Sequence, residues 1–453
     1  MRKLVGILEQ GLLLVIWLVM AMGLFYPWEN FSSPGGDALG DARVQGTGTD
    51  HAVYLILFCC ICLIALLRWK GVIRTLGLAW PFLVLCGWIV LSALWATDPA
   101  VSLSTAGRFM ILIIFSAYVS SAYDSLQFVA FLTRGFAIAV AASLAVMILA
   151  PRLGFSNLGG GYGDAWRGAF THKNWLGAAM SVGTLVGAYS YGVRANHRLL
   201  SGATFIGCLF LLIMSRSATS IVSTLVAFLV AILGAAIQNR RVPVLRAFAL
   251  MGLLATVVLA LLYPLMDINL KDLPRLAGRS SDLTGRAEVW RAVWAAIQNR
   301  PLTGYGYGFW TVPSVTRSNI WLSANWEVPH SHNNWLDAGL QLGLVGVVIA
   351  AFIWLSALRR AMWLIFVQYG HGALLYLTIL FGCLTKSAVE TVTFAPGILS
   401  LFWWVTSYIY IARIAREKAA ATNTPRRSPA PDQRPARRWP KPPHRHTLPA
   451  IRE

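Results

Sequence analysis

The sequence predicts an all-α integral membrane protein with about twelve transmembrane helices. Hydrophobic residues make up 57% of the chain and charged residues only 12%, which argues against a water-soluble protein. The apolar residues form uninterrupted blocks, and blocks of about 17 to 25 residues are long enough to cross a hydrocarbon core of about 30 Å as helices. Basic residues between alternate blocks give the spans a consistent orientation.

The apolar blocks are spread over most of the chain. The first is long and ends in the bulky sequence FYPWEN, so we interpret it as a retained span and not as a cleaved signal peptide. The block centres are Leu14, Leu57, Leu85, Ile113, Ala139, Val182, Ile206, Val226, Val257, Ile349, Leu377 and Trp404. All six cysteines lie inside these blocks, where a thiol behaves as a small hydrophobic group, so we expect no disulfide and no metal cluster of cysteines.

The blocks divide the chain into four predicted parts. The first is an N-terminal membrane bundle of about nine helices over residues 1–264. A long helical periplasmic loop over 265–340 carries the site, and C-terminal transmembrane helices follow over 341–413. Residues 414–453 form a basic, Pro-rich tail that we predict to be disordered and cytoplasmic, lying against anionic lipid heads and not on nucleic acid.

The orientation follows from Lys and Arg in short loops, which stay in the cytoplasm. Such residues occur at the N-terminal MRK and near Arg68, Arg194, Asn239 and Leu358. If the spans alternate, these loops share one side with the tail, and both termini are cytoplasmic. The stretch 151–174, the turn MSRSATS and the region 265–340 then face the opposite, periplasmic side.

Several basic residues on that opposite side are not explained by orientation. They are Arg167 and Lys173 in DAWRGAFTHKNWLG, Arg216 in MSRSATS and Arg286 in TGRAEVW. Charge beside a membrane span is costly and usually lines a polar cavity or binds a ligand. Because Arg makes bidentate contacts with phosphate oxygens, the pattern favours a diphosphate ligand delivered from the membrane.

Less specific interpretations remain open for some of these charges. Arg167 could be an ordinary loop or lipid-head contact. Lys386, inside the eleventh block, could pair with Glu390 four residues later, one helical turn away.

The predicted periplasmic loop contains an amphipathic helix. Thr284 is a suitable N-cap, and an apolar face follows, which suits a helix at the membrane interface. The residues of this face are Val289, Trp290, Val293, Trp294 and Ile297. The sequence GYGYG after it lacks the strand and the Lys-containing helix of a phosphate loop, so we predict a tight turn.

The sequence HSHNNWLDAGLQLGLVG carries the strongest catalytic candidate. The imidazole of His332 can take a proton from a sugar hydroxyl near neutral pH, and Asn333 could hold the ring or the acceptor sugar. Gly343 and Gly346 on the following helix would let a neighbouring helix approach closely.

Two other roles compete for this histidine. It could cap the following helix, although Asn333 and Asn334 are better caps. It could also form a zinc site with His330 and a third ligand, but no Cys or acidic cluster in the sequence supports one. We therefore predict neither a metal nor a cofactor.

The ordered motifs resemble those of a known family. The sequences RGAFTHKNWLG, SRSATS, TGRAEVW and GYGYGFW precede His332, Asn333, Gly343 and Gly346, an order that resembles the O-antigen ligase and polymerase superfamily of bacterial membrane glycosyltransferases. The resemblance covers roughly residues 167–346 by motif. It implies a GT-C-like inner-membrane enzyme that takes a glycan from undecaprenyl diphosphate and passes it to an acceptor hydroxyl at the periplasmic face, without a metal.

The resemblance also implies roles for individual residues. The catalytic histidine falls on His332 and the two diphosphate-binding arginines on Arg216 and Arg286. We add four predicted substrate contacts: Arg167, Lys173, Asn174 and Asn333. A single displacement would invert the anomeric carbon.

Alternative functions stay open at this stage. The FTHKNWLG tract looks more like that of exopolysaccharide polymerases, which use another lipid-linked glycan as acceptor, than like that of a ligase, which uses a lipid A core. A transporter or flippase of lipid-linked sugars is the alternative from another class. The absence of an evident internal repeat and the long outer region on one face argue against transport.

Overall fold

The computed structural model describes residues 2–22, 48–156, 165–238, 286–367, 372–391, 394 and 398–423. Within these ranges the only β pairing is an isolated bridge between Phe155 and Trp166. The helices are α1 (Arg2–Met22), α3 (Gly48–Leu67), α4 (Trp69–Leu78), α5 (Trp80–Leu91), η2 (Ser92–Leu94), α6 (Pro99–Ala122), α7 (Ser125–Leu149), α8 (Pro151–Gly154), α9 (Lys173–Val193), α10 (Arg198–Met214), α11 (Ala218–Gln238), α14 (Arg286–Asn299), η3 (Phe309–Thr311), α15 (Val315–Ala324), α16 (Asn334–Phe366), α17 (Gly372–Ser387) and α18 (Ile398–Asn423). The predicted all-α class is confirmed for this part of the chain.

Some predictions fall outside the described residues. They concern the block centred on Val257, the N-cap at Thr284, residues 265–285 of the predicted loop and residues 424–453 of the tail. Every other predicted block centre lies inside one of the helices.

Several helices have the length and composition of membrane spans. Among the described residues α6, α7, α11 and α16 meet both criteria, and α4 with the segment Trp80–Leu94 forms a pair bent by 85° that could act as one broken span. α10 and α17 are apolar but shorter. These helices indicate an integral membrane protein, whereas the predicted number of about twelve spans is not confirmed.

The helices pack around one aromatic-rich core. The indole of Trp404 is fully buried and stacks on Trp354, with ring centroids 5.2 Å apart, while the edge of Phe82 meets it at 4.8 Å. Glycine allows closer packing elsewhere: a Cβ at Gly187 of α9 would lie 2.8 Å from the backbone nitrogen of Phe205 in α10. Small residues of this kind let helix backbones approach within a membrane bundle.

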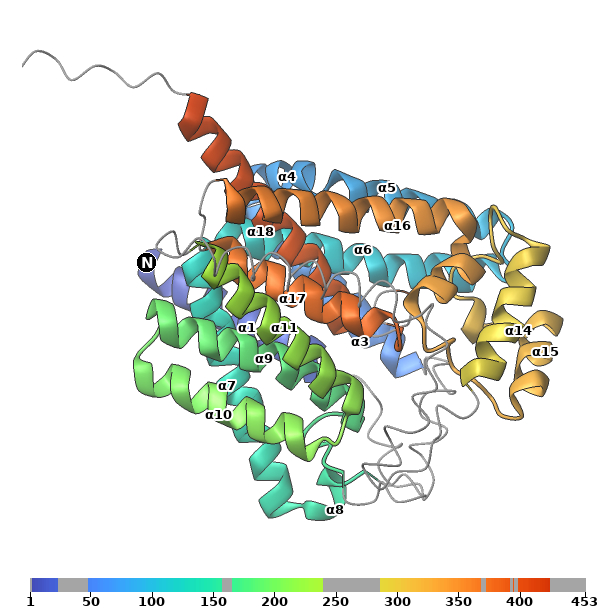
Figure 1. Ribbon diagram of the computed structural model, residues 1–453, viewed down its shortest axis with the longest axis horizontal. Helices are drawn as coiled ribbons and strands as arrows, with labels where there is room; N and C mark the ends of the chain where they lie inside the picture. Colours follow the sequence, from blue (N-terminus) through green and yellow to red (C-terminus); the bar gives the residue numbers. More distant parts are fainter. Residues whose placement is uncertain are drawn as a thin grey trace, which may run out of the picture.

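A smaller core lies at one end of the molecule, opposite the N-terminus of α1 (Figure 1). It is formed by α14, η3, α15 and the start of α16, and its fully buried members include Val289, Val293 and Leu340. The predicted amphipathic helix is thus confirmed as α14, but its apolar face packs against protein. Trp294 is not part of this core, since it is 56% exposed.

α16 is broken at Gly343, where φ is 67°. The turn that contains GYGYG fills this break: the backbone amides of Tyr305 and Gly306 donate to the carbonyls of Leu340 and Gln341 at 2.9 Å each. A Cβ at Gly343 would lie 2.2 Å from the carbonyl oxygen of Leu302. The predicted tight turn is confirmed, and the close approach at Gly343 is made by this loop and not, as predicted, by a neighbouring helix.

Candidate active site

The His332 loop leads directly into α16. Asn333 is the N-cap of that helix, and its side-chain oxygen accepts hydrogen bonds from the amides of Trp335 at 3.0 Å and Leu336 at 3.1 Å. Asn333, not His332, therefore satisfies the free amides of the first turn. His332 has a φ of 53°, a left-handed conformation that is uncommon for a residue other than glycine. Its imidazole is left available for other contacts.

The loop is held by buried hydrogen bonds. Asp337 is fully buried, and its Oδ1 accepts from the amide of Ser331 at 3.1 Å and from the indole of Trp310 at 2.8 Å. The hydroxyl of Thr391 donates to the other carboxylate oxygen of Asp337. Trp290 of α14 donates from its indole to the carbonyl of Ser331 at 2.8 Å. Three separate segments thus fix the backbone beside His332.

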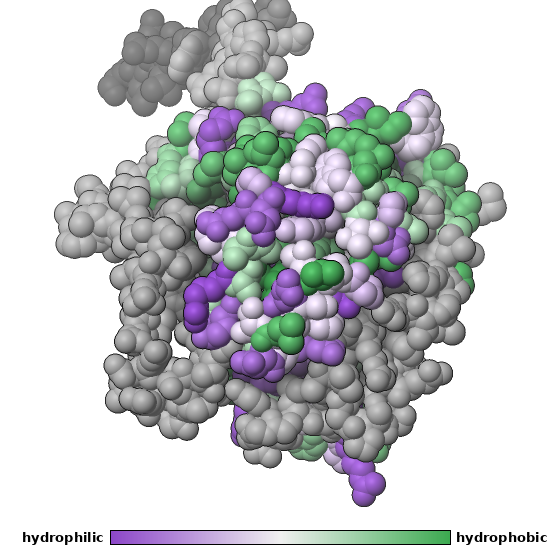
Figure 2. All heavy atoms as spheres, turned by 90° about the vertical axis from the view of Figure 1, so that its right-hand side faces the viewer, coloured by the Kyte–Doolittle hydropathy of each residue, from purple (hydrophilic) through white to green (hydrophobic). Residues whose placement is uncertain are grey.

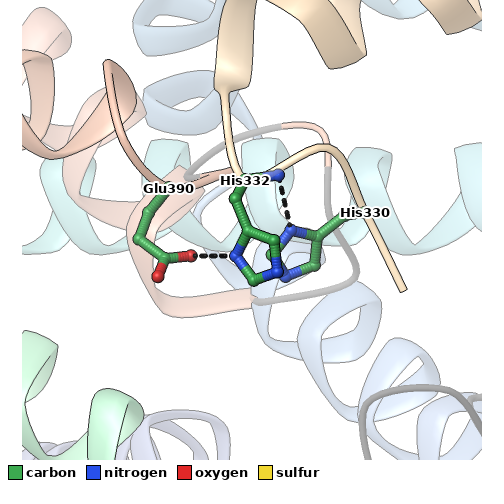
Figure 3. Close-up of side chains that lie close together, drawn as sticks. All are labelled: His330, His332 and Glu390. Carbon is green, nitrogen blue, oxygen red and sulfur yellow. Dashed lines mark hydrogen bonds and ion pairs between the residues drawn. The ribbon is translucent and has the colours of Figure 1, made fainter. Parts of the chain in front are cut away.

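Glu390, just beyond the end of α17, contacts both His332 and Arg286. Figure 3 shows its contact with His332. Its Oε2 lies 3.2 Å from Nδ1 of His332, and its Oε1 lies 3.3 Å from Nη2 of Arg286. The guanidinium also donates through Nη1 to the carbonyl of Val389 at 2.7 Å. Arg286 and His332 are therefore brought to the two oxygens of one carboxylate.

The charge on Glu390 follows from these partners. Burial by itself would raise the pKa of this carboxyl group, but the hydrogen bond from His332 and the charges of His332, His330 and Arg286 bring the pKa well below its ordinary value. An ionised carboxylate can only accept hydrogen bonds, so Nδ1 of His332 carries the proton. When the ring carries only this proton, its lone pair lies on Nε2, the atom that can act as a base.

His330 lies beside His332. The two ring centroids are 4.2 Å apart, and Nδ1 of His330 accepts a hydrogen bond from the backbone amide of His332 at 3.2 Å. His330, His332 and Glu390 each offer one ligand atom, and these atoms lie within 4.8 Å of one another. The third donor, Glu390, could not be predicted from the motif because it follows His332 by 58 residues.

The other predicted site residues form a second group around the turn between α10 and α11. The amide of Trp166 donates to the carbonyl of Met214 at 3.0 Å, and a Cβ at Gly177 would lie 2.7 Å from that of Ser217. These contacts place the turn with Arg216 against the stretch that precedes α9 and against the first turns of α9. Arg216 is exposed and has a φ of 49°.

The predicted substrate contacts in this group are largely engaged by the protein. Arg167 is only 3% exposed and donates from Nε to the carbonyl of Leu153 at 2.8 Å and from Nη1 to that of Thr171 at 3.4 Å. Lys173 is buried at the start of α9. Asn174 is half-buried, and its backbone amide donates to Nδ1 of His172 at 3.1 Å.

A pocket lies within the helix bundle. Its volume is about 370 Å³, including space open to solvent, and its walls come from α9, α11, α17 and α18. Ala178 lies one turn after Asn174, and Lys386 lies one turn before Glu390. Lys386, which the sequence suggested could pair with Glu390, lines the pocket. The carboxylate oxygens of Glu390 contact Arg286 and His332.

The face of the molecule that carries α14 and α15 mixes polar and apolar side chains (Figure 2). Among its exposed hydrophobic residues is Trp326, which is 43% exposed. Its ring centroid lies 6.0 Å from that of His332, with the planes tilted by 34°. An exposed aromatic ring thus stands next to the candidate base.

Comparison with known proteins gives one family. The family model described as O-Antigen ligase matches residues 203–351, and no curated protein matches the chain. The matched region contains Arg216, Arg286, His332 and Asn333, whereas Arg167, Lys173, Asn174 and Glu390 lie outside it. Members of this family are glycosyltransferase-like enzymes. This match over residues 203–351 supports the resemblance of the motifs to the O-antigen ligase and polymerase superfamily.

Proposed function

We propose that this protein is a membrane glycosyltransferase that transfers a glycan from undecaprenyl diphosphate to a sugar hydroxyl at the periplasmic face of the bacterial inner membrane. The observation that carries the proposal is the link from Arg286 through Glu390 to His332, because Arg286 and His332 both lie within the region that matches the ligase family. The proposal includes about twelve spans, cytoplasmic termini and a GT-C-like arrangement. The four predicted parts of the chain belong to it as well.

His332 acts as the general base in this reaction. Glu390 holds the proton on Nδ1, so Nε2 can accept the proton of the acceptor hydroxyl as its oxygen attacks the anomeric carbon. The bond from that carbon to the diphosphate oxygen breaks in the same step, which inverts the configuration. No metal takes part in the proposed step.

Arg286 and Arg216 stabilise the departing diphosphate. A preorganised positive charge at the leaving oxygens lowers the barrier because negative charge grows there in the transition state. Arg286 is already oriented by Val389 and Glu390. Arg216 is exposed on a turn packed against the start of α9, so it can turn toward the same ligand.

The remaining predicted site residues are assigned to binding of the sugars and the diphosphate. Lys173 and Asn174 lie beside the turn of Arg216, and Arg167 supports the loop before them through its hydrogen bonds. Asn333 holds the His332 loop by capping α16 and by donating to the carbonyl of Ala388. Trp326 offers an apolar ring face on which an acceptor sugar can lie.

We favour a polymerase, in which the acceptor is a second lipid-linked glycan, in exopolysaccharide or O-antigen synthesis. The ligase alternative transfers the same donor to a lipid A core. A transporter or flippase would need the arginines to bind the diphosphate but would not need a base. Replacement of His332 therefore distinguishes glycan transfer from transport.

The test is a transfer assay with purified protein in detergent. Undecaprenyl-diphosphate-linked repeat units are supplied with chelator, and product length is followed for the wild type, His332→Ala and the neighbouring His330→Asn control. We expect longer lipid-linked chains from the wild type and the control, and a loss of about 10²- to 10⁴-fold in rate for His332→Ala.

Other outcomes change the proposal in defined ways. Transfer only after a lipid A core is added identifies a ligase. Equal product from the wild type and His332→Ala contradicts the role of His332 as base. If neither acceptor gives product, and the wild type and His332→Ala both move the lipid-linked glycan across the membrane of vesicles, the protein is a transporter.

A further inference from the structure

We propose that His330, His332 and Glu390 form a binding site for Zn²⁺ that switches off the base His332. The switching rests on the proposed function, whereas the metal site stands on the donor geometry alone. Two imidazoles and one carboxylate are a ligand set that zinc binds in proteins, with a fourth position open to water.

The distances suit a site that closes on the ion. Nδ1 of His332 and Oε2 of Glu390 are 3.2 Å apart, near the edge of about 3.3 Å that a tetrahedral zinc ion with bonds of about 2.0 Å requires. All three ligand atoms lie within 4.8 Å of one another, so His330 has only a short way to move. Figure 3 shows the His330 ring directly beside that of His332.

The nearby positive charge does not block the site. Arg286 bonds Oε1 of Glu390, and the oxygen that faces His332 is Oε2. One carboxylate can therefore bind the guanidinium through one oxygen and the metal through the other. Arg286 also orients the carboxylate, as outer contacts do for metal ligands generally.

Zinc bound at this site would prevent Nε2 of His332 from accepting a proton. If the ion takes Nδ1 of His332, the ring proton resides on Nε2, which then donates and no longer accepts. If the ion takes Nε2 instead, that lone pair is used up. In both cases the acceptor hydroxyl keeps its proton, so zinc inhibits transfer without occupying the diphosphate site.

The experiment measures binding and inhibition separately. The full chain is purified in detergent without a polyhistidine tag, stripped with chelator and titrated with Zn²⁺, and with Mg²⁺ as a control that prefers oxygen ligands. The matched variant is His330→Asn, because the Asn side-chain oxygen can still accept from the His332 amide. We expect a site with one Zn²⁺ per chain that is weakened at least tenfold in the variant, and no response to Mg²⁺.

Transfer by the wild type should fall as this site fills and recover with chelator, while His330→Asn stays active in the same zinc concentration. Unchanged zinc affinity in His330→Asn, or no saturable binding by the wild type, overturns the proposal. Absorption of Co²⁺ in the wild type gives a second test that needs no variant: a spectrum without tetrahedral character also overturns it. Zinc binding with no transfer under any condition leaves the metal site standing and rejects the proposed function.

Discussion

The two groups of charged residues beside the pocket use their charges in different ways. Around His332 the side chains contact one another, because the carboxylate of Glu390 contacts both Arg286 and the imidazole of His332. Around the start of α9 the buried Arg167 bonds backbone carbonyls of its own loop. An arginine that is tied to an ionised, reactive partner is placed for chemistry, whereas one that satisfies carbonyls supports the fold. The bonding partner of each arginine, and not the residue type alone, therefore indicates whether it serves the reaction or the fold.

After His332→Ala, the largest effect should come from Arg286→Lys. A lysine keeps the charge but cannot donate in a fork to Val389 and Glu390 while also facing a diphosphate. We expect the transfer rate to fall by about 10²-fold with little change in thermal stability. Single-turnover rates with saturating donor measure this, and Arg291→Lys, an exposed arginine on the same helix paired with Glu288, is the control. A rate within twofold of the wild type would remove Arg286 from the site.

Glu390→Gln tests the link itself. The amide can still accept from Nδ1 of His332, but it lacks the charge that favours this proton position and pairs with Arg286. We expect kcat to fall by about 10- to 100-fold while KM for the donor changes little, as for other carboxylates that orient a histidine. A purely structural role would lower the amount of folded protein and leave the kcat of the folded fraction unchanged.

Arg167→Met tests the opposite side of the comparison. The variant keeps an unbranched apolar stem but leaves the carbonyls of Leu153 and Thr171 without their guanidinium donor. We expect the free energy of unfolding to fall by about 1 to 3 kcal/mol, with the kcat of folded protein preserved. Thermal unfolding in detergent followed by tryptophan fluorescence measures the loss. A stable variant without activity would instead return Arg167 to the substrate contacts predicted from the sequence.

The sequence predicted the helices because they depend on local information. Apolar blocks specify helices directly, and the block centres among the described residues all lie in helices. The partners of the site could not be predicted in this way. Glu390 contacts His332 although it lies 58 residues later in the chain. The loop that fills the break at Gly343 includes Leu302, about 40 residues earlier. Both contacts therefore depend on how distant parts of the chain pack together.

The smallest effect should come from Asn333→Ser. Serine still caps α16, but it loses the amide donor that reaches the carbonyl of Ala388 at 3.1 Å. We expect a change of less than about 1 kcal/mol in stability, because the cap itself remains. The Ala388 contact holds the segment that carries Glu390, so kcat should fall a few-fold. A loss of rate larger than that of Glu390→Gln would mean that Asn333 touches the acceptor directly, and the His332 group would then extend into the sugar site.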